Sequence, residues 1–201
     1  MKKIGIIGGT FNPVHLAHLI IAEQFTNELQ LDTCYFFPCF ISPFKTDVAS
    51  KTENVAEHRL QMLKLATQSN PKFIVDDFEI VQKGISYTYN TILYLKEKEP
   101  DSKFYLLIGS DQALSFKQWS NWEKILESVQ VCVAFRADDL EKEPEIIDIL
   151  MYKFHTPIIL HSPIINISAS QIREKIKQKN SIKSLVPDTV EDYIYSHKLY
   201  L

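Results

Sequence analysis

Short apolar segments rich in β-branched and aromatic residues alternate with longer segments of helical periodicity along most of this chain. The segments expected to form strands are Lys3–Gly8, Thr33–Pro38, Phe73–Val75, Lys103–Gly109, Val129–Phe135 and Pro157–Leu160. The segments expected to form helices are Pro13–Leu29, Glu53–Ser69, Thr88–Lys98, Trp119–Glu127, Glu145–Met151, Ala169–Gln178 and Asp188–His197. This alternation is typical of βαβ units, and strands that are apolar throughout indicate a parallel sheet covered by helices on both faces.

The sequence therefore predicts an α/β protein with a Rossmann-like, doubly wound parallel sheet. Its 201 residues contain no linker or repeat, which favours one domain over residues 1–201. From about residue 165 only helices are expected, and residues 165–201 are predicted to form a small C-terminal helical subdomain. Because ligands of open α/β sheets bind at the carboxyl ends of the strands, the residues that follow strands are the candidates for function.

The charge and cysteine content limit the partners of this chain. A formal net charge of −3 gives no overall basic field, which argues against nucleic acid and anionic lipid and favours a small ligand. No apolar run approaches a membrane span, and the apolar start that ends at Gly8 is too short for a signal peptide. Cys34, Cys39 and Cys132 lie in apolar segments and are expected to be free, buried thiols. We therefore expect a cytoplasmic protein, and the sequence leaves a homo-oligomer open.

The first expected strand runs directly into the segment G-G-T-F-N-P-V-H-L-A-H at residues 8–18. Gly8 and Gly9 permit a tight turn and the close approach of a ligand to the backbone. Asn12 is expected to cap the following helix and Pro13 to be its first residue. The N–H groups and positive dipole end of that helix predict an anion site above the strand. The segment matches neither the dinucleotide fingerprint nor the P-loop.

Two histidines, His15 and His18, stand three residues apart near this expected helix start, so both rings should project from one face. The helix dipole disfavours their protonation and a bound polyphosphate favours it, so they should donate strongly to phosphate only when ligand is present. The alternative is a pair of partly buried, hydrogen-bonded histidines, and a zinc site would need further ligands. Their position beside the two glycines favours the functional interpretation.

A second helix start of unusual composition lies near the end of the chain, where residues 167–173 read I-S-A-S-Q-I-R. Ser168 is predicted as N-cap, with Gln171 completing a capping box. Arg173 lies early in this helix, where its charge opposes the dipole, a placement that makes sense if an anion occupies the same end. Ser170 is placed to add a hydroxyl to the same anion. The alternative for Arg173 is an exposed side chain.

These two segments resemble the marks of the nucleotidylyltransferase superfamily, G-G-T-F-[DN]-P-x-H-x-x-H and I-S-[ST]-[ST]-x-I-R. Further segments are similar to those of the bacterial-type nicotinate mononucleotide adenylyltransferases: P-C-F-I-S-P-F-K at 38–45, S-Y-T at 86–88, I-G-S-D at 108–111 with Trp119 downstream, and L-V-P at 185–187. The resemblance covers almost the whole chain. Asn12 stands where the family commonly has Asp, Ala17 where it has Gly, and Phe44 where it often has His. The first two changes keep the cap and the small size, whereas Phe44 removes a phosphate donor.

The resemblance implies adenylyl transfer from ATP, accompanied by Mg²⁺, to nicotinic acid mononucleotide, giving deamido-NAD and pyrophosphate in NAD biosynthesis. The catalytic residues that it implies are His15, His18, Lys45 and Arg173. The ATP-binding residues that it implies are Gly8, Gly9, Thr10, Phe11, His18, Gly109, Asp111, Ile167, Ser168, Ser170 and Arg173. The mononucleotide-binding residues that it implies are Lys45, Tyr87, Thr88, Trp119 and Arg136. Ordinary alternatives are core packing for Tyr87 and Trp119 and solvent exposure for Arg136.

The chemistry of such a reaction needs little from the protein besides placement and charge. A phosphate monoester is already anionic near neutral pH, so no strong general base is required, and catalysis rests on positioning and charge stabilisation. No metal site made of protein side chains is expected, because Asp76 and Asp77 are adjacent in a strand-like segment and should point to opposite faces.

Other functions of this fold remain as rivals. One is adenylyl transfer to nicotinamide mononucleotide or phosphopantetheine, and another is a nucleotide-binding regulator without turnover. The S-Y-T segment at 86–88 and Trp119 argue against phosphopantetheine. The intact His15, His18 and Arg173 argue against a regulator.

Overall fold

The computed structural model describes residues 1–44, 53–135, 137–161 and 165–201. Its strands are β1 (Lys2–Gly9), β2 (Thr33–Pro38), β3 (Phe73–Val75), β4 (Ser102–Gly109), β5 (Gln130–Phe135) and β6 (Ile158–His161). Its α-helices are α1 (Leu16–Glu28), α2 (Glu53–Thr67), α3 (Phe78–Gln82), α4 (Thr88–Lys98), α5 (Ser110–Leu114), α6 (Trp122–Ser128), α7 (Glu143–Leu150), α8 (Ala169–Lys177) and α9 (Asp188–Ser196). Short 3₁₀ turns cover Phe116–Gln118 and Ala137–Lys142.

Within the described residues the strands form one sheet in the order β3-β2-β1-β4-β5-β6, and every neighbouring pair is parallel. The chain winds outward from β1 in one direction through β2 and β3 and then in the other from β4 to β6. This is the Rossmann order, and its switch point lies between β1 and β4. The predicted doubly wound parallel sheet is confirmed, and the ligand side of the sheet is the carboxyl edge of these two central strands.

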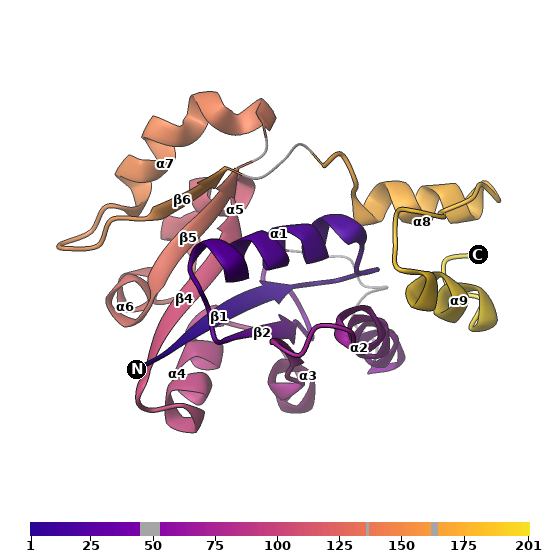
Figure 1. Cartoon of the computed structure of the whole chain (residues 1–201), viewed down its shortest axis with the longest axis horizontal. Coiled ribbons are helices and arrows are strands. Elements are labelled where there is room, and N and C mark those ends of the chain that lie inside the picture. Colours follow the sequence, from indigo (N-terminus) through magenta and orange to yellow (C-terminus); the bar gives the residue numbers. More distant parts are fainter. Residues whose placement is uncertain (45–52, 136, 162–164) are drawn as a thin grey trace.

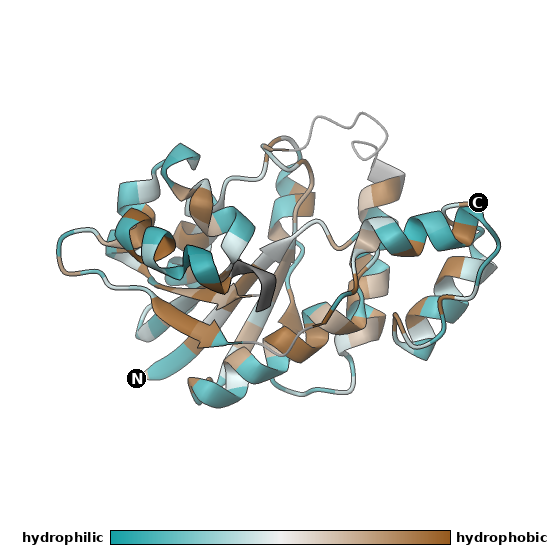
Figure 2. Ribbon diagram, turned by 90° about the horizontal axis from the view of Figure 1, so that it is seen from above, coloured by the Kyte–Doolittle hydropathy of each residue, from teal (hydrophilic) through white to brown (hydrophobic). Residues whose placement is uncertain are grey.

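Each face of the sheet is covered by its own set of helices, as Figure 2 shows by the hydrophobic strands lying between helices with hydrophilic outer surfaces. On one face, Phe25 of α1 and Leu63 of α2 belong to the same buried cluster as Ile172 of α8. On the other face, residues of α4 to α7, such as Ile92 and Ile146, form a second cluster. Adjacent strand residues feed opposite clusters, which is why the strands are apolar without alternation.

The helices α8 and α9 lie beyond the carboxyl end of β1, at the opposite end of the molecule from the N-terminus (Figure 1). Helix α9 packs against α2, and the Tyr193 hydroxyl lies 2.9 Å from Nδ1 of His58. Because Ile172, Ile176 and Val190 join the core cluster of α1 and α2, this helical pair is anchored to the sheet domain. The assignment of residues 1–201 to one domain and of residues 165–201 to a subdomain stays a prediction.

Two predicted helix starts are wrong. The first helix begins at Leu16 with His15 as N-cap, not at Pro13 with Asn12 as N-cap. The physical reason is that Asn12 is held elsewhere: its carbonyl and side-chain oxygens accept hydrogen bonds from the C-terminal part of the chain. The helix expected from Trp119 begins at Trp122, because Asn121 takes a left-handed conformation with φ of 57° and separates it from the preceding 3₁₀ turn.

The three cysteines are buried and free, as predicted. Burial raises the pKa of the Cys34 thiol strongly and that of Cys132 to about 12. Both thiols are therefore neutral core side chains near neutral pH.

His155 makes the stability of the β5 end of the sheet depend on pH. Its Nε2 accepts a hydrogen bond from the Val131 N–H at 3.2 Å, and its Nδ1 lies 3.0 Å from the carbonyl oxygen of Leu150. Accepting at one nitrogen while donating at the other requires the neutral ring, and burial lowers the pKa of His155 below its ordinary 6.5.

We therefore expect the free energy of unfolding to fall as the pH is lowered. The contribution of the neutral ring is complete above the ordinary pKa of 6.5 and is lost as the pH falls through the lower folded pKa of His155. Thermal unfolding midpoints measured between about pH 8 and about pH 5 should drop more for the wild type than for His155→Gln, whose side chain does not titrate. Equal slopes for the two proteins would contradict this assignment.

Candidate active site

The carboxyl end of β1 leads into a turn in which Gly8 and Gly9 have different surroundings. A Cβ on Gly9 would lie 2.9 Å from the Phe11 ring, so this position requires a residue without a side chain. A Cβ on Gly8 would meet no described atom within 4 Å, which leaves open space above the strand. The left-handed residue of the turn is Phe11, with φ of 48°, and neither glycine has a positive φ. The space for a ligand is therefore above Gly8, and Phe11 is the residue whose left-handed conformation makes the turn.

The rings of His15 and His18 are stacked with their centroids 3.7 Å apart, so the predicted pairing on one face is confirmed. His15 is buried, and His18 is partly exposed. The His15 N–H donates to Nδ1 of His18 at 3.2 Å. Since Nδ1 accepts this bond, the proton of a neutral His18 ring is on Nε2. The helix start therefore orients His18 as an Nε2–H donor.

The anion site expected at the start of α1 is smaller than the sequence suggested. The Leu16 N–H donates to the Leu185 carbonyl at 3.0 Å, and the His18 N–H donates to the His15 carbonyl at 3.0 Å. These two N–H groups of the first turn are therefore already bonded to protein. The anion site expected here stays a prediction, with fewer backbone donors than a free helix start would offer and with the two histidine rings beside it.

Helix α8 begins as predicted. Ser168 Oγ accepts the Gln171 N–H at 3.2 Å, and Gln171 Oε1 accepts the Ser168 N–H at 3.1 Å, which completes the capping box. This cap fixes the direction in which Ser170 and Arg173, in the first two turns of α8, face.

Arg173 joins the two ends of the chain. Its Nη1 donates to the Asn12 carbonyl at 2.7 Å, and its Nη2 donates to Ser170 Oγ at 3.3 Å. The Tyr200 hydroxyl donates to Oδ1 of the same Asn12 at 2.6 Å. The alternative of a freely exposed arginine therefore does not hold, and a guanidinium lies directly beside the β1–α1 turn.

Arg59 of α2 is a site residue that the sequence interpretation missed. Its side chain is 1% exposed, its Nη1 donates to the Thr10 carbonyl at 2.8 Å, and its Nη2 donates to the Phe40 carbonyl at 3.2 Å. Burial lowers the pKa of the guanidinium below its ordinary value. The one sequence signal was its helical spacing: Arg59 falls on the same face as the buried Ala56 and Leu63.

The end of β4 lies beside the end of β1, since Ile7 pairs with Leu107. A Cβ on Gly109 would lie 2.6 Å from Oδ1 of Asp111, so the glycine makes room for that carboxylate. The Gly109 N–H donates to the Gln112 side chain at 3.0 Å, which caps the short α5. The structure thus brings Gly109 and the exposed Asp111 to the switch point next to Gly8.

The segment Ser86–Thr88 leads into α4, whose bounds Thr88–Lys98 are those that the sequence predicted, and Tyr87 is its N-cap. The Ser86 N–H donates to the Ile41 carbonyl at 2.9 Å, and Ile41 and Ile85 form an isolated parallel bridge. The loop after β2 therefore runs beside this helix start, and Tyr87 is 38% exposed there.

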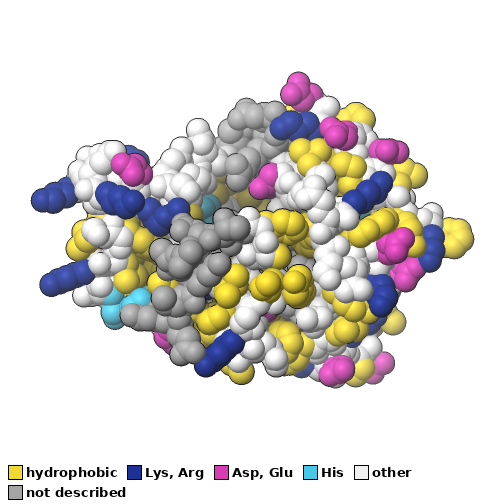
Figure 3. All heavy atoms as spheres, turned by 180° about the vertical axis from the view of Figure 1, so that it is seen from behind, with side chains coloured by type: hydrophobic (Ala, Val, Ile, Leu, Met, Phe, Trp, Pro, Cys, Tyr) yellow, Lys and Arg dark blue, Asp and Glu magenta, His cyan; other side chains and the backbone are white. Residues whose placement is uncertain are grey.

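Trp119 belongs to an aromatic group on the same side. Its ring centroid lies 5.1 Å from that of the buried Phe116 and 6.3 Å from that of Phe44, which is 53% exposed. Trp119 Nε1 is buried without a hydrogen-bond partner among the described residues. Figure 3 shows hydrophobic side chains gathered in the middle of one face of the molecule. The Trp119 ring therefore packs against the core on its Phe116 side, and on its other side it has the more exposed Phe44 as a neighbour.

Two predicted site residues, Lys45 and Arg136, lie outside the described residues. Asp76 and Asp77 follow β3 and do not lie within it, but the structural interpretation of Asp76 holds. Its carboxylate is buried and accepts hydrogen bonds from the Phe78 N–H, the Tyr94 hydroxyl and the Lys98 ammonium. In the described part of the chain, no group of three or more His, Cys, Asp and Glu side chains is placed to hold a metal ion.

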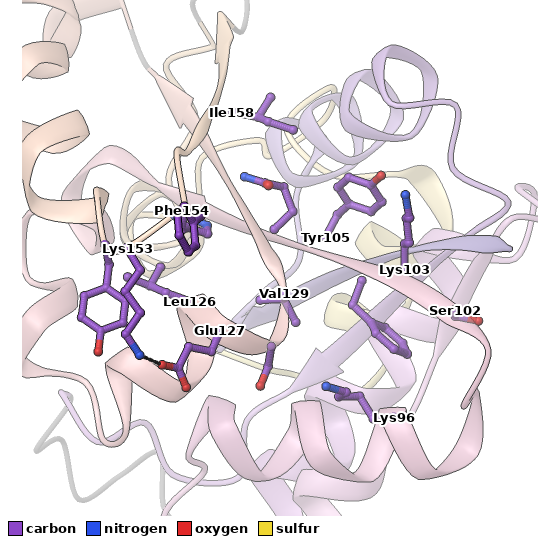
Figure 4. Close-up of a pocket in the computed structure, with 15 residues that line it drawn as sticks. Lys96, Ser102, Lys103, Tyr105, Leu126, Glu127, Val129, Lys153, Phe154 and Ile158 are labelled. Atoms are coloured by element: carbon purple, nitrogen blue, oxygen red, sulfur yellow. Dashed lines mark hydrogen bonds and ion pairs between the residues drawn. The ribbon is translucent and has the colours of Figure 1, made fainter.

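A separate hollow of about 680 Å³ lies at the opposite, amino edge of the sheet, between Lys103 of β4, Val129 and the turn that carries Phe154 (Figure 4). Lys153 and Glu127 form an ion pair at its rim, and the Phe154 side chain is 102% exposed. Ligands of parallel sheets bind at the carboxyl edge, so this hollow is no part of the candidate site.

The chain is similar to known proteins over its whole length. Residues 6–175 match the model of a family described as cytidylyltransferase-like. A probable nicotinate-nucleotide adenylyltransferase of Lachnoclostridium phytofermentans is 36% identical over 203 residues, covering 100% of both chains. Its counterpart of the same name in Enterococcus faecalis is 38% identical over 200 residues, which is 99% of this chain and 85% of the relative.

Solved structures share the fold. The nicotinic acid mononucleotide adenylyltransferase of Plasmodium falciparum complexed with NaAD superposes with a TM-score of 0.80 at 23% identity, covering 100% of this chain and 98% of the other. The complex of the same enzyme with APC superposes with a TM-score of 0.77 at 22% identity, with the same coverage. At this identity the likeness shows a common architecture.

Proposed function

Since the chain belongs to the cytidylyltransferase-like family and matches nicotinate-nucleotide adenylyltransferases over its whole length, we infer that it transfers the adenylyl group of ATP to nicotinic acid mononucleotide. An oxygen of the mononucleotide phosphate attacks the α-phosphorus of ATP. The bond from that phosphorus to the bridging oxygen breaks and pyrophosphate leaves. The products are the dinucleotide deamido-NAD and pyrophosphate, and the reaction belongs to NAD biosynthesis.

The observation that carries this function is the junction of Arg173 with the β1–α1 turn. Its bond to the Asn12 carbonyl at 2.7 Å brings the start of α8 to the stacked His15 and His18. Two imidazoles and a guanidinium are thereby gathered at the carboxyl end of β1, where a polyphosphate would lie. Such preorganised donors stabilise the charge that develops on the transferring phosphoryl group.

On this basis each site residue has a proposed role. His18 and His15 donate to the phosphates of ATP, and Arg173 meets the leaving pyrophosphate. The open space over Gly8 admits the nucleotide beside the strand end. The further residues proposed to line the ATP site are Gly9, Thr10, Phe11, Gly109, Asp111, Ile167, Ser168 and Ser170.

We propose that the acceptor binds across the 86–88 segment and Trp119. The Thr88 end of α4 receives the pyridine carboxylate, and the Trp119 ring stacks on the pyridine from the side that Phe44 partly covers. Lys45 and Arg136 are proposed to meet the acceptor's phosphate, as the family resemblance implies.

Enzymes of this family use a divalent metal ion with ATP. We propose Mg²⁺, carried as part of the nucleotide substrate and held mainly by phosphate oxygens and water. The ion supplies charge neutralisation on the phosphates, while His18 and Arg173 orient them.

Partners and compartment follow from the same proposal. ATP and nicotinic acid mononucleotide are the substrates, and neither nucleic acid nor a membrane is needed for the reaction. In the described part of the chain, no helix has the length and hydropathy that crossing a bilayer requires. We propose a cytoplasmic enzyme, and a homo-oligomeric state is to be measured by size-exclusion chromatography with light scattering.

A pyrophosphate-release assay with ATP and a panel of acceptors tests the function directly. Nicotinic acid mononucleotide, nicotinamide mononucleotide and phosphopantetheine should be compared under the same Mg²⁺ conditions. Release that depends on either pyridine mononucleotide supports the adenylyltransferase. Release that depends on phosphopantetheine alone, or no release with any acceptor, contradicts it.

The acid mononucleotide should be preferred over the amide. The N–H groups of Thr88 and Tyr89, at the first positions of α4, precede the intrahelical ladder and lie at the positive end of the helix dipole. They suit a carboxylate better than a carboxamide, whose single oxygen accepts these bonds without a full negative charge. Hydrogen bonds to a charged group contribute about 1.5 to 3 kcal/mol, so kcat/KM should differ by about ten- to a hundredfold. Equal kcat/KM values for the two mononucleotides, or a higher value for the amide, would contradict a role in the synthesis of deamido-NAD.

A further inference from the structure

A chain of buried hydrogen bonds starts at Glu79 of α3, on the side of α4 that faces the core. Glu79 is 8% exposed, and its Oε1 accepts the Thr91 hydroxyl at 2.6 Å. The Ser86 side chain lies near enough to the same carboxylate to favour its ionised form. One side chain of α3 thus bonds to the first turns of α4 and lies beside the segment that precedes them.

Ser86 passes this connection on to the loop after β2. Its Oγ accepts the Phe40 N–H at 2.9 Å, and its own N–H donates to the Ile41 carbonyl at 2.9 Å. Because the oxygen accepts from the backbone, the hydroxyl hydrogen is available to the nearby Glu79 carboxylate. The Ser86 side chain therefore fixes the distance between the 40–41 backbone and the start of α4.

Arg59 completes the connection. It donates to the Phe40 carbonyl at 3.2 Å and to the Thr10 carbonyl at 2.8 Å. A path of hydrogen bonds therefore runs from the β1–α1 turn through Arg59 and Phe40 to Ser86, which lies beside Glu79. The two loops that the proposed function gives to the two substrates are parts of one buried network.

We propose that Glu79 is a positioning residue for the acceptor mononucleotide: through Ser86 and Thr91 its carboxylate holds the start of α4 in the orientation that receives the pyridine carboxylate. This inference rests on the proposed function. Glu79 lies beneath the site and acts through these two hydroxyls.

The choice of a carboxylate at this position has a physical reason. The Thr91 hydroxyl donates to it and the Ser86 hydroxyl lies beside it, and the oxygens of one carboxyl group can accept from both. Burial raises the pKa of Glu79, while the hydroxyls of Thr91 and Ser86 and the charge of Arg59 oppose that change. Burying a carboxyl group is costly in free energy unless hydrogen-bond donors surround it.

The test is a split between the Michaelis constants of the two substrates. In Glu79→Gln, one carboxylate oxygen becomes an NH₂ donor that faces a donor hydroxyl. We expect the KM for nicotinic acid mononucleotide to rise about fivefold or more, while the KM for ATP and kcat stay within about twofold of the wild type. Glu97→Gln removes an exposed carboxylate from α4 and serves as the matched control, with unchanged constants.

Ser86→Ala and the double variant extend the test. Ser86→Ala removes a single hydroxyl and should give the same selective rise, so it carries the test if Glu79→Gln does not fold. The double variant should be little worse than either single one, because both remove the same connection. An unchanged KM for the acceptor, or an equal rise in both KM values, overturns the positioning role.

The wild type separates this inference from the function on which it rests. If the wild type releases no pyrophosphate with either pyridine mononucleotide, the proposed function fails. If the wild type turns over and the Glu79 and Ser86 variants keep its acceptor KM, the function stands and the role of Glu79 is overturned.

Discussion

Replacing His18 by alanine is expected to lower kcat about a hundredfold, the effect of removing one preorganised donor from a transition-state site. The His15 N–H holds Nδ1 of His18 at 3.2 Å, so the proton is on Nε2, on a ring stacked at 3.7 Å on that of His15. That Nε2–H is proposed to donate to the phosphoryl group as its negative charge develops. Steady-state pyrophosphate release at saturating substrates measures the loss.

A second variant separates catalysis from helix capping. In His18→Gln, the side-chain oxygen can still accept the His15 N–H, because Gln is a common capping-box residue at this position. It should keep the folded structure and show a similar loss of kcat. His161→Ala, which removes an exposed histidine at the end of β6, is the matched control. A kcat near the wild-type value in both His18 variants would refute the catalytic assignment.

Replacing Arg173 by alanine is expected to raise the KM for ATP by about ten- to a hundredfold, with a much smaller effect on the KM for the mononucleotide. A hydrogen bond between charged groups contributes about 1.5 to 3 kcal/mol, which gives this range. The guanidinium lies at 2.7 Å from the Asn12 carbonyl and is thereby aimed at the β1–α1 turn. Arg173→Lys keeps the charge and loses the planar fork, so an intermediate KM is expected.

The same arginine also ties the C-terminal helices to the turn, and Tyr200→Phe distinguishes that contribution. This variant removes the bond from the Tyr200 hydroxyl to Asn12 Oδ1, 2.6 Å long, without removing a positive charge. It should weaken ATP binding far less than Arg173→Ala does. If both variants raise the KM for ATP equally, Arg173 acts only as a structural tie.

The fold was largely predictable because its signals are local. Apolar runs and helical periodicity are properties of consecutive residues, and they gave the parallel doubly wound sheet and strand bounds within about two residues. The α8 start was predicted in full, since a capping box needs only Ser168 and Gln171. The short helices α3 and α5 were missed, because five residues leave no periodicity to detect.

The start of the first helix could not be predicted from neighbouring residues. Asn12 and Pro13 form a good cap and first turn by composition, yet the helix begins at Leu16. The competing contacts come from Arg173 and Tyr200, 161 and 188 residues away, which bind the oxygens of Asn12. The local preference of Asn12 for an N-cap position was overridden by tertiary hydrogen bonds, which the residues near it in the sequence do not indicate.

Patterns of neighbouring residues were enough to predict the main elements, the parallel sheet, and the two segments that hold the candidate chemistry. How these segments meet became visible only in the folded chain. Arg173 reaches the β1–α1 turn, and the Leu185 carbonyl accepts the hydrogen bond of a first-turn N–H group of α1. Arg59 and Glu79 are buried beneath the site. The physical reason is that propensity and periodicity act between neighbours in sequence, whereas a buried charge is stabilised by whichever distant carbonyls and hydroxyls the fold brings to it.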